Sequence, residues 1–376
     1  MARPLLFIFS FDTIDHRSLR MPCGLLCALV ILVCVEGLLH FYECRLPDPV
    51  LWGNIETSAK MCQAKFWNKE QGESCDVLIL GPSHARFGIS PKAIHEVVED
   101  MKLTVYNGAL NGRTYSVLEF ILKNVYLPEL RPRVLVLAVN PLIFNRHNVW
   151  MEQNTSEFFE APKPKALSSK GIARIWRTFL TNHINLYRYR ERHDGLQKGH
   201  LDDGISLDKY GFSAIEGIYD DKQRAWLKSP EHPYQKIMRE FDFGGPSAEA
   251  FVQILQYARD RQIGILVVNM PFRKDLLSIS PKGTEDYNKF LHEIQALQHE
   301  YGFTWLDYQA DLLLADEDFR DVDHLNSQGA RQLSARLGED LVKFVTSIET
   351  LSSSHSQMRS VLLNHSSTSK TMRSMQ

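Results

Sequence analysis

The sequence predicts an α/β fold: a parallel sheet covered by helices on both faces, preceded by one N-terminal transmembrane helix. Two observations indicate the sheet. Short, continuous apolar runs recur along the chain, and segments with helical apolar spacing separate them. Strands that alternate with helices of this length run parallel, because each helix carries the chain back across the sheet. The third observation is an apolar stretch near the N-terminus that is far longer than a strand.

That stretch covers residues 21–42, MPCGLLCALVILVCVEGLLHFY, with a single interruption at Glu36. About 20 apolar residues are enough to cross a bilayer. Basic residues lie on its N-terminal side, at Arg3, Arg17 and Arg20. Residues 1–20 are therefore expected in the cytoplasm, and the rest of the chain on the exported side, periplasmic or extracellular, of a single-pass protein. No small-residue cleavage site follows, which favours a retained signal anchor; a buried core helix is the alternative.

Composition sets limits on partners and compartment. The chain has 376 residues, 44% of them hydrophobic, which suits one large or two modest domains. Its net charge of −2 offers no basic field, so nucleic acid is not an expected partner. All six cysteines fall at or before Cys75, and Cys62 is close enough in sequence to pair with it, although the spacing does not require this. No Cys/His cluster has zinc spacing, so neither a metal nor a cofactor is expected.

After a connector at residues 43–74, the alternating elements define a catalytic domain expected at residues 75–348. Strands are expected at 76–81, 103–108, 133–140, 263–271 and 304–310. Helices are expected at 90–101, 114–127, 247–262 and 284–302, with a last one starting near His324. The helix at 90–101 has Ser90 as a candidate N-cap and Pro91 at its first position.

Two segments depart from the alternation. Residues 141–246 are interpreted as an insertion. Within it, GIARIWRTFLTNHINLYRYRERH (171–193) places apolar residues on one helical face with arginines between them. A packed helix with a solvated basic face is expected there; a lid and a membrane-surface helix are alternatives. The Ser-rich residues 349–376 are expected to form a disordered tail.

Polar residues follow the strands at the edge where open parallel sheets bind ligands. Ser83 comes after the first strand, in GPSHARFGISP, and a Gly-rich turn, NGALNGRT, ends the second. Asn140 ends the third strand. In DVDHLN, Asp321 and His324 stand three residues apart at the start of a helix. These loops would bring a hydroxyl, a flexible turn, an amide and an Asp–His pair to one edge of the sheet.

This order of residues resembles that of the SGNH (GDSL-type) hydrolases, whose four sequence blocks supply Ser, Gly, Asn and His. The matching segments are GPSHARFGISP, NGALNGRT, LAVNP and DVDHLN, and they span residues 76–326. The pattern is most similar to the membrane-anchored, exported branch, which includes the teichoic-acid D-alanylation and alginate O-acetylation proteins. The resemblance implies a flavodoxin-like three-layer α/β/α sandwich, the SGNH hydrolase fold.

The chain departs from the family pattern at three places. Pro82 stands where the first block has Asp, Ala138-Val139-Asn140-Pro141 replaces Gly-x-Asn-Asp, and Leu325 follows the histidine where a proline is common. These differences argue against an ordinary secreted lipase more than they argue against the SGNH hydrolase fold.

Carried over residue by residue, the resemblance makes Ser83 the nucleophile and His324 its general base. Asp321 would orient the imidazole and stabilise its charged form. Asp323 is the alternative carboxylate, but a direct neighbour rarely reaches a ring nitrogen, whereas a three-residue spacing across a turn can. His84 is expected to order the turn or contact substrate, outside the triad.

The resemblance also implies an oxyanion hole. Its donors would be the backbone N–H of Ser83, the backbone N–H of Gly112 and the side-chain amide of Asn140. Gly108 is an alternative to Gly112; aligning Asn107 with the leading asparagine of the block favours Gly112.

The expected function is that of a serine O-acyltransferase acting on ester-linked acyl groups, acetyl in the first place, of an exported polysaccharide or envelope polymer. Related systems receive the acyl group from a polytopic membrane O-acyltransferase, so the resemblance implies such a partner. A carbohydrate or lipid esterase with the same site is the first alternative. A catalytically inactive SGNH-like binding or assembly module is the second.

Overall fold

The sheet is built from five parallel strands in the order β2-β1-β3-β4-β5. In this computed structural model, residues 20–42, 55–72, 74–159, 207–237 and 240–373 are described, together with the isolated positions 180, 184 and 186. The strands are β1 (Val77–Leu80), β2 (Val105–Asn107), β3 (Val134–Val139), β4 (Gly264–Asn269) and β5 (Thr304–Asp307). This is the flavodoxin-like strand order, so the predicted fold class is confirmed.

Strands β1 and β3 are buried on both faces, and their side chains are apolar at every position. Leu78 and Leu135 point into one core, whereas Val77 and Val134 point into the other. This alternation follows from the two-residue period of a strand. A continuous apolar run such as VLIL therefore fits only a strand that is covered on both sides.

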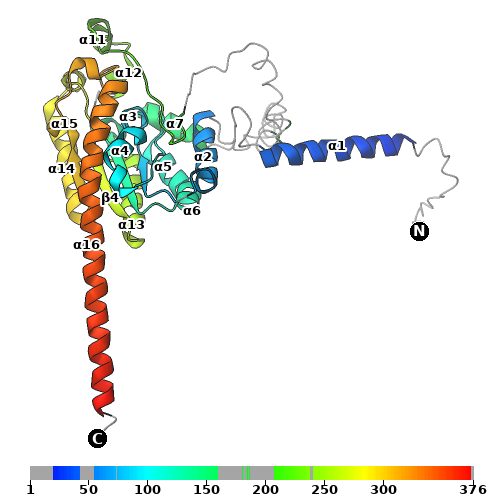
Figure 1. Ribbon diagram of the computed structural model, residues 1–376. Coiled ribbons are helices and arrows are strands. Elements are labelled where there is room, and N and C mark those ends of the chain that lie inside the picture. The colour runs from blue at the N-terminus through cyan, green and yellow to red at the C-terminus, as the bar shows by residue number, and fades with distance from the viewer. Residues whose placement is uncertain are drawn as a thin grey trace, which may run out of the picture. The chain divides into compact units, whose positions relative to one another are not determined.

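Helices supply the two cores (Figure 1). One core is completed by α2 (Ile55–Gln71), α5 (Tyr115–Ile121), α6 (Leu127–Leu130), α13 (Gly245–Asp260) and α14 (Thr284–Tyr301). The other is completed by α3 (Ser83–Gly88), α4 (Pro91–Val97), α15 (Tyr308–Asp311) and α16 (Ser327–Arg373). The insertion contributes α7 (Val149–Phe159), α11 (Asp221–Leu227) and α12 (Pro233–Ile237). Residues 171–193 lie outside the described residues, apart from the three isolated positions.

The chain divides into two compact units, Met1–Leu51 with Ala161–Asp203, and Trp52–Glu160 with Gly204–Gln376. The first contains α1 (Arg20–Tyr42), whose stretch Cys23–Tyr42 is long and apolar enough to cross a membrane and is not buried. A signal sequence would meet the same criteria. The second unit contains the sheet and the helices that cover it.

Two expectations about the ends of the domain differ from the structure. Residues 349–373 were expected to be disordered, but they continue α16, which is visible as the long red end of that helix in Figure 1. The segment contains no proline or glycine that would stop a helix. The connector expected at 43–74 contains α2, whose Met61, Ala64 and Trp67 pack in the core.

Cys62 and Cys75, whose pairing the sequence left open, do not form a disulfide bond. Cys75 is a free thiol, buried beside the first strand, and donates to the Val77 carbonyl at 3.2 Å. Burial raises the pKa of this thiol above its usual range. Cys62 is nevertheless disulfide-bonded.

Polar residues on the buried face of α2 explain why the sequence did not show it as a core helix. Glu56 forms an ion pair with Arg86 of α3, and both side chains are almost fully buried. Lys60 donates from Nζ to the carbonyl oxygens of Asn107, at 3.0 Å, and Ala109. Polar and charged side chains can be buried when they have internal partners. Because such residues occupy part of the buried face of α2, that face does not show as an apolar stripe in the sequence.

Lys60 makes the stability of the domain depend on pH. Burial lowers its pKa from 10.5 to about 7, although Glu56 acts in the opposite direction. In the unfolded chain the amine keeps its proton up to about 10.5, so unfolding takes up a proton in the window from about 7 to 10.5. Stability from this group therefore rises with pH across that window.

Replacement of Lys60 by methionine is expected to remove this contribution, because methionine fills a similar space without a titratable group. Urea unfolding of both proteins across that window measures the effect. As the pH increases, the free energy of unfolding of the wild type should increase relative to that of Lys60→Met. A difference that stays constant with pH would mean that the folded protein keeps Lys60 protonated.

Candidate active site

Ser83 is presented by the turn that ends β1. Gly81 is needed in this turn, since a Cβ there would lie 2.9 Å from the Cβ atoms of both Ala138 and Ala85. The Pro82 carbonyl accepts the first hydrogen bonds of α3, from the backbone N–H groups of Ala85 and Arg86. Ser83 is the first residue of this helix, where a backbone N–H has no partner within the helix. The hydroxyl is thus held at the sheet edge beside an available amide.

The structure brings Ser83, His324 and Asp321 together as predicted. The Ser83 Oγ lies 2.7 Å from His324 Nε2. On the other side of the ring, His324 Nδ1 lies 2.9 Å from Asp321 Oδ1. The same carboxylate oxygen accepts a hydrogen bond from the backbone N–H of His324 at 2.9 Å, so the turn holds the Asp321 carboxylate next to the His324 ring. This is the order of contacts that a serine nucleophile needs from its base and the group that orients the base.

A second carboxylate also reaches this histidine. Asp323, which is only 1% exposed, places Oδ1 at 3.3 Å from His324 Nδ1. Its other oxygen lies 2.7 Å from His84 Nε2 and accepts a hydrogen bond from the Tyr234 hydroxyl at 2.8 Å. Asp321 has the closer contact with His324, in agreement with the spacing argument. Asp323 nevertheless reaches the ring of its direct neighbour, which was not expected.

His84 lies inside the site. Its ring stacks on that of His324, with centroids 4.9 Å apart and an angle of 17° between the planes. The Asn140 amide nitrogen contacts its ring nitrogens at 2.6 Å (Nε2) and 3.0 Å (Nδ1). Sequence reasoning missed the His84–Asp323 pair and Tyr234 altogether. Tyr234 comes from α12, 89 residues before Asp323, and no sequence pattern links the two.

The carboxylates control the charge of His324. Burial opposes the imidazolium, but the negative charges of Asp323 and Asp321 outweigh burial and raise the pKa of His324 above its ordinary value. Burial likewise disfavours the Asp323 carboxylate, yet His324 and His84 hold its pKa well below the usual range. The site therefore favours an ion pair between the base and its carboxylates, which stabilises the histidine when it accepts a proton.

The two glycines proposed for the oxyanion hole have different environments. Gly108 donates its N–H to the Ile79 carbonyl at 2.9 Å, and a Cβ there would lie 2.8 Å from the Tyr126 ring. It is a packing glycine whose N–H is already used. Gly112 adopts a left-handed conformation with φ of +63°, which glycine tolerates best. Gly112 remains the better candidate.

Asn140 is fixed by both ends of its amide. Its Oδ1 accepts the Ile143 backbone N–H at 3.2 Å as a helix N-cap, which turns the amide nitrogen toward His84. The roles of Asn140 and Gly112 as donors to an oxyanion stay predictions.

His84, Asp323 and His324 offer ligand atoms within 4.8 Å of one another, close enough for a metal ion. These atoms already form the contacts described above with Tyr234, Asp321 and Ser83. A cation would have to compete with that network, so we assign the cluster to hydrogen bonding.

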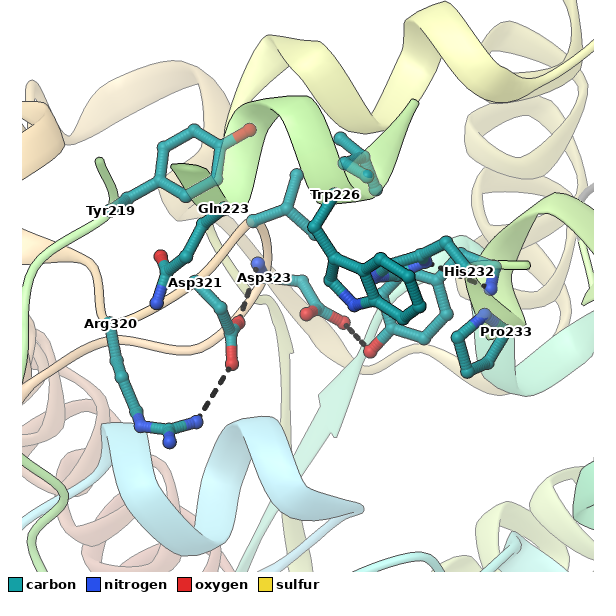
Figure 2. A pocket seen from close by; sticks show the side chains of 11 residues that line it. Tyr219, Gln223, Trp226, His232, Pro233, Arg320, Asp321 and Asp323 are labelled. Atoms are coloured by element: carbon teal, nitrogen blue, oxygen red, sulfur yellow. Dashed lines mark hydrogen bonds and ion pairs between the residues drawn. The ribbon is translucent and has the colours of Figure 1, made fainter. Parts of the chain in front are cut away.

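A cavity of about 370 Å³ opens next to the two carboxylates (Figure 2). Its walls come from α11, α12 and the loop at residues 320–323, and they include Asp321 and Asp323 but not Ser83. It therefore adjoins the acidic side of the site.

No protein-family model matches the chain, and no curated protein matches it. Several solved structures do. A GDSL-like lipase from Bacteroides thetaiotaomicron is 7% identical, and the match covers 76% of this chain and 98% of the lipase, with a TM-score of 0.35. An acetyl xylan esterase is 13% identical, covering 70% of this chain and 98% of the other, with a TM-score of 0.35. A carbohydrate acetylesterase family member from Sinorhizobium meliloti is 12% identical, covering 72% and 99%, with a TM-score of 0.33.

Proposed function

We propose that this protein is an SGNH-type serine enzyme that removes or transfers ester-linked acyl groups. The observation that carries the proposal is the contact of 2.7 Å between Ser83 Oγ and His324 Nε2. A serine hydroxyl is a poor nucleophile at neutral pH and needs an adjacent base, which this contact supplies. Asp321 completes the arrangement by accepting a hydrogen bond from the Nδ1–H of the ring.

The proposed reaction has two steps. Ser83 Oγ attacks the ester carbonyl while its proton passes to His324 Nε2. The tetrahedral intermediate collapses to an acyl-serine, and His324 returns the proton to the departing alcohol. An acceptor hydroxyl then gives its proton to His324 Nε2 and attacks the acyl-serine. As the bond between the acyl group and Ser83 Oγ breaks, His324 returns the proton to Ser83 Oγ. With water as acceptor the product is a carboxylic acid; with a glycan hydroxyl it is a new ester.

We place transfer of acetyl groups on an exported polysaccharide or envelope polymer ahead of hydrolysis. The span Cys23–Tyr42 supports a membrane tether, which would keep the enzyme near membrane-borne acyl donors and raise their effective concentration. The disulfide bond of Cys62 supports an oxidising compartment, as expected on the exported side of a membrane. A polytopic O-acyltransferase that delivers the acyl group is part of this proposal.

Assay of the full-length protein with p-nitrophenyl acetate, with and without glycan acceptors, tests the proposal. An acyltransferase should release p-nitrophenol and form acetylated glycan at the expense of free acetate, which mass spectrometry can follow. Release of free acetate alone, whatever the acceptor, would identify an esterase. A folded protein that releases no p-nitrophenol and reacts with no fluorophosphonate probe would be the inactive module.

A further inference from the structure

Asp323 is a second carboxylate in the site, beyond the one that a serine triad requires. It is almost fully buried, and its two oxygens have different partners. Oδ2 lies 2.7 Å from His84 Nε2 and accepts a hydrogen bond from the Tyr234 hydroxyl at 2.8 Å. None of the described residues donates a hydrogen bond to Oδ1, which lies 3.3 Å from His324 Nδ1. The carboxylate is therefore held by one oxygen and faces the ring of the base with the other.

We propose that Tyr234, from the insertion helix α12, is a positioning residue of the active site. By holding Asp323 Oδ2, it keeps Oδ1 directed at His324 Nδ1, where the negative charge stabilises the imidazolium that forms during acyl transfer. The proposal rests on the proposed function. It adds that the catalytic site is completed by the insertion and not by the sheet edge alone.

The charge of His324 depends on both carboxylates. Asp321 Oδ1 and Asp323 Oδ1 lie 2.9 Å and 3.3 Å from the same ring nitrogen, Nδ1. When Nε2 takes the proton of Ser83, the positive ring lies against two negative groups in a largely buried site, where charges interact strongly. Asp323 contributes fully only while Oδ1 faces the ring. Because this carboxylate is buried, protein donors rather than water have to fix its orientation.

The Tyr234 hydroxyl is suited to this task because it is a constant donor. A carboxylate only accepts hydrogen bonds, so the phenol has to donate to it. Burial and the charge of Asp323 raise the pKa of Tyr234 well above its usual range, so the hydroxyl keeps its proton at neutral pH. His84, the other partner of Oδ2, donates only in the states of the ring that carry a proton on Nε2.

The helix that carries Tyr234 is anchored independently of this hydroxyl. Asn145 Nδ2 donates to the Ile237 carbonyl at 2.7 Å, and Ile237 itself is buried in the core. Gln235 Nε2 donates to the Leu227 carbonyl of α11 at 2.8 Å. Replacement of Tyr234 by phenylalanine should therefore remove the hydrogen bond to Asp323 and leave α12 in place.

Other titratable and charged side chains among the described residues lie on the elements around His324. They are Asp321 and Arg320 in the same loop, His84 and Arg86 on α3, and His232 before α12. Tyr234→Phe changes none of them. A shift in the titration of His324 in this variant therefore reports the orientation of Asp323.

The pH dependence of kcat/KM on p-nitrophenyl acetate tests the proposal in the full-length protein. In Tyr234→Phe, the limb that reports neutral His324 should move to lower pH by about one unit, the equivalent of one hydrogen bond to a charged group. Below that limb the variant should be about tenfold faster than the wild type, because more of the base is neutral. A purely structural role of Tyr234 would lower activity at every pH.

Two further variants show whether Tyr234 acts through Asp323. In the Asp323→Asn background, Tyr234→Phe should leave the limb where Asp323→Asn alone places it. A further shift in this background would contradict the proposal. Tyr219→Phe is the matched control, because it removes a hydroxyl that lines the same cavity but donates to Asp275, at 3.1 Å. It should leave the pH profile unchanged.

NMR separates this proposal from the proposed function, because the titration of the His324 ring needs no substrate. Full-length protein with isotope-labelled histidine is titrated, and the signal is assigned by its loss in His324→Gln. A midpoint that falls in Tyr234→Phe, without any Ser83-dependent hydrolysis, would sink the proposed function and keep the role of Tyr234 in holding Asp323. Hydrolysis with an unchanged midpoint overturns the positioning role alone. So does a midpoint that rises, because Asp323 would then have stayed in place and Tyr234 would only screen its charge.

Discussion

Ser83→Ala is expected to lower kcat on p-nitrophenyl acetate by about 10⁶-fold, the size of loss that removal of the nucleophile causes in a serine enzyme. The physical reason is that the attacking hydroxyl is lost: among the described residues, the hydroxyl oxygen that contacts His324 Nε2 is Ser83 Oγ, at 2.7 Å. The variant should also lose covalent labelling by a fluorophosphonate probe, which mass spectrometry can locate on the peptide that contains residue 83.

Ser90→Ala is the matched control. Ser90 follows in the same loop region, but its hydroxyl caps α4 by accepting the Ala93 backbone N–H at 3.4 Å. Its loss should reduce the free energy of unfolding by about 1 kcal/mol while labelling at Ser83 persists. If Ser83→Ala kept more than a small fraction of the wild-type rate, another group would be the nucleophile and the proposed mechanism would be wrong.

Asp321→Asn is expected to lower kcat by about 10⁴-fold, because an asparagine favours the wrong tautomer of the histidine. Asp321 Oδ1 is the closest acceptor for His324 Nδ1, at 2.9 Å. With the amide there, the ring can carry its proton on Nε2 and can no longer accept one from Ser83. Steady-state kinetics at the optimum pH measure the loss, and circular dichroism confirms that the variant is folded.

Asp323→Asn serves as the comparison and should change the pH profile more than the maximal rate. Of the two carboxylates that raise the pKa of His324, Asp323 has the larger effect. The base has to be neutral to act, so kcat/KM of the wild type should rise with pH along a limb that lies above the ordinary histidine value of about 6.5. Removing the Asp323 charge lowers the pKa, and the limb should move to lower pH.

The opposite result would exchange the two roles. If Asp323→Asn abolished activity while Asp321→Asn mainly moved the acid limb, then Asp323 would be the group that orients His324. Asp321, which the three-residue spacing favours, would then only influence the pKa of His324.

Local patterns in the sequence were enough to predict the sheet and the loops that carry Ser83, Asn140 and His324. A run such as VLIL at Val77–Leu80 is stable only between two apolar layers, and parallel strands place their carboxyl ends at one edge. The N-cap at Ser90 was likewise predictable, because capping involves atoms within one turn. The contact between Asp321 and His324 belongs to this class, since both residues lie in one turn.

Features that depend on charged residues with distant partners became visible only in the folded protein. Glu56 and Lys60 look like surface residues of a connector until Arg86 and the carbonyl of Asn107 are placed beside them. The same holds for the contact of Asp323 with His84 and Tyr234, residues separated from it by 239 and 89 positions.

Linear patterns thus predicted the sheet, the order of its elements along the chain and the edge where a hydroxyl, an imidazole and a carboxylate meet. These follow from apolar periodicity and from short-range geometry, which a linear pattern records. The folded chain decided which second carboxylate and second imidazole surround His324, that α2 belongs to the core, and that Cys62 does not pair with Cys75. A buried charge is stable only with a partner, and the identity of that partner is set by the packing of distant segments.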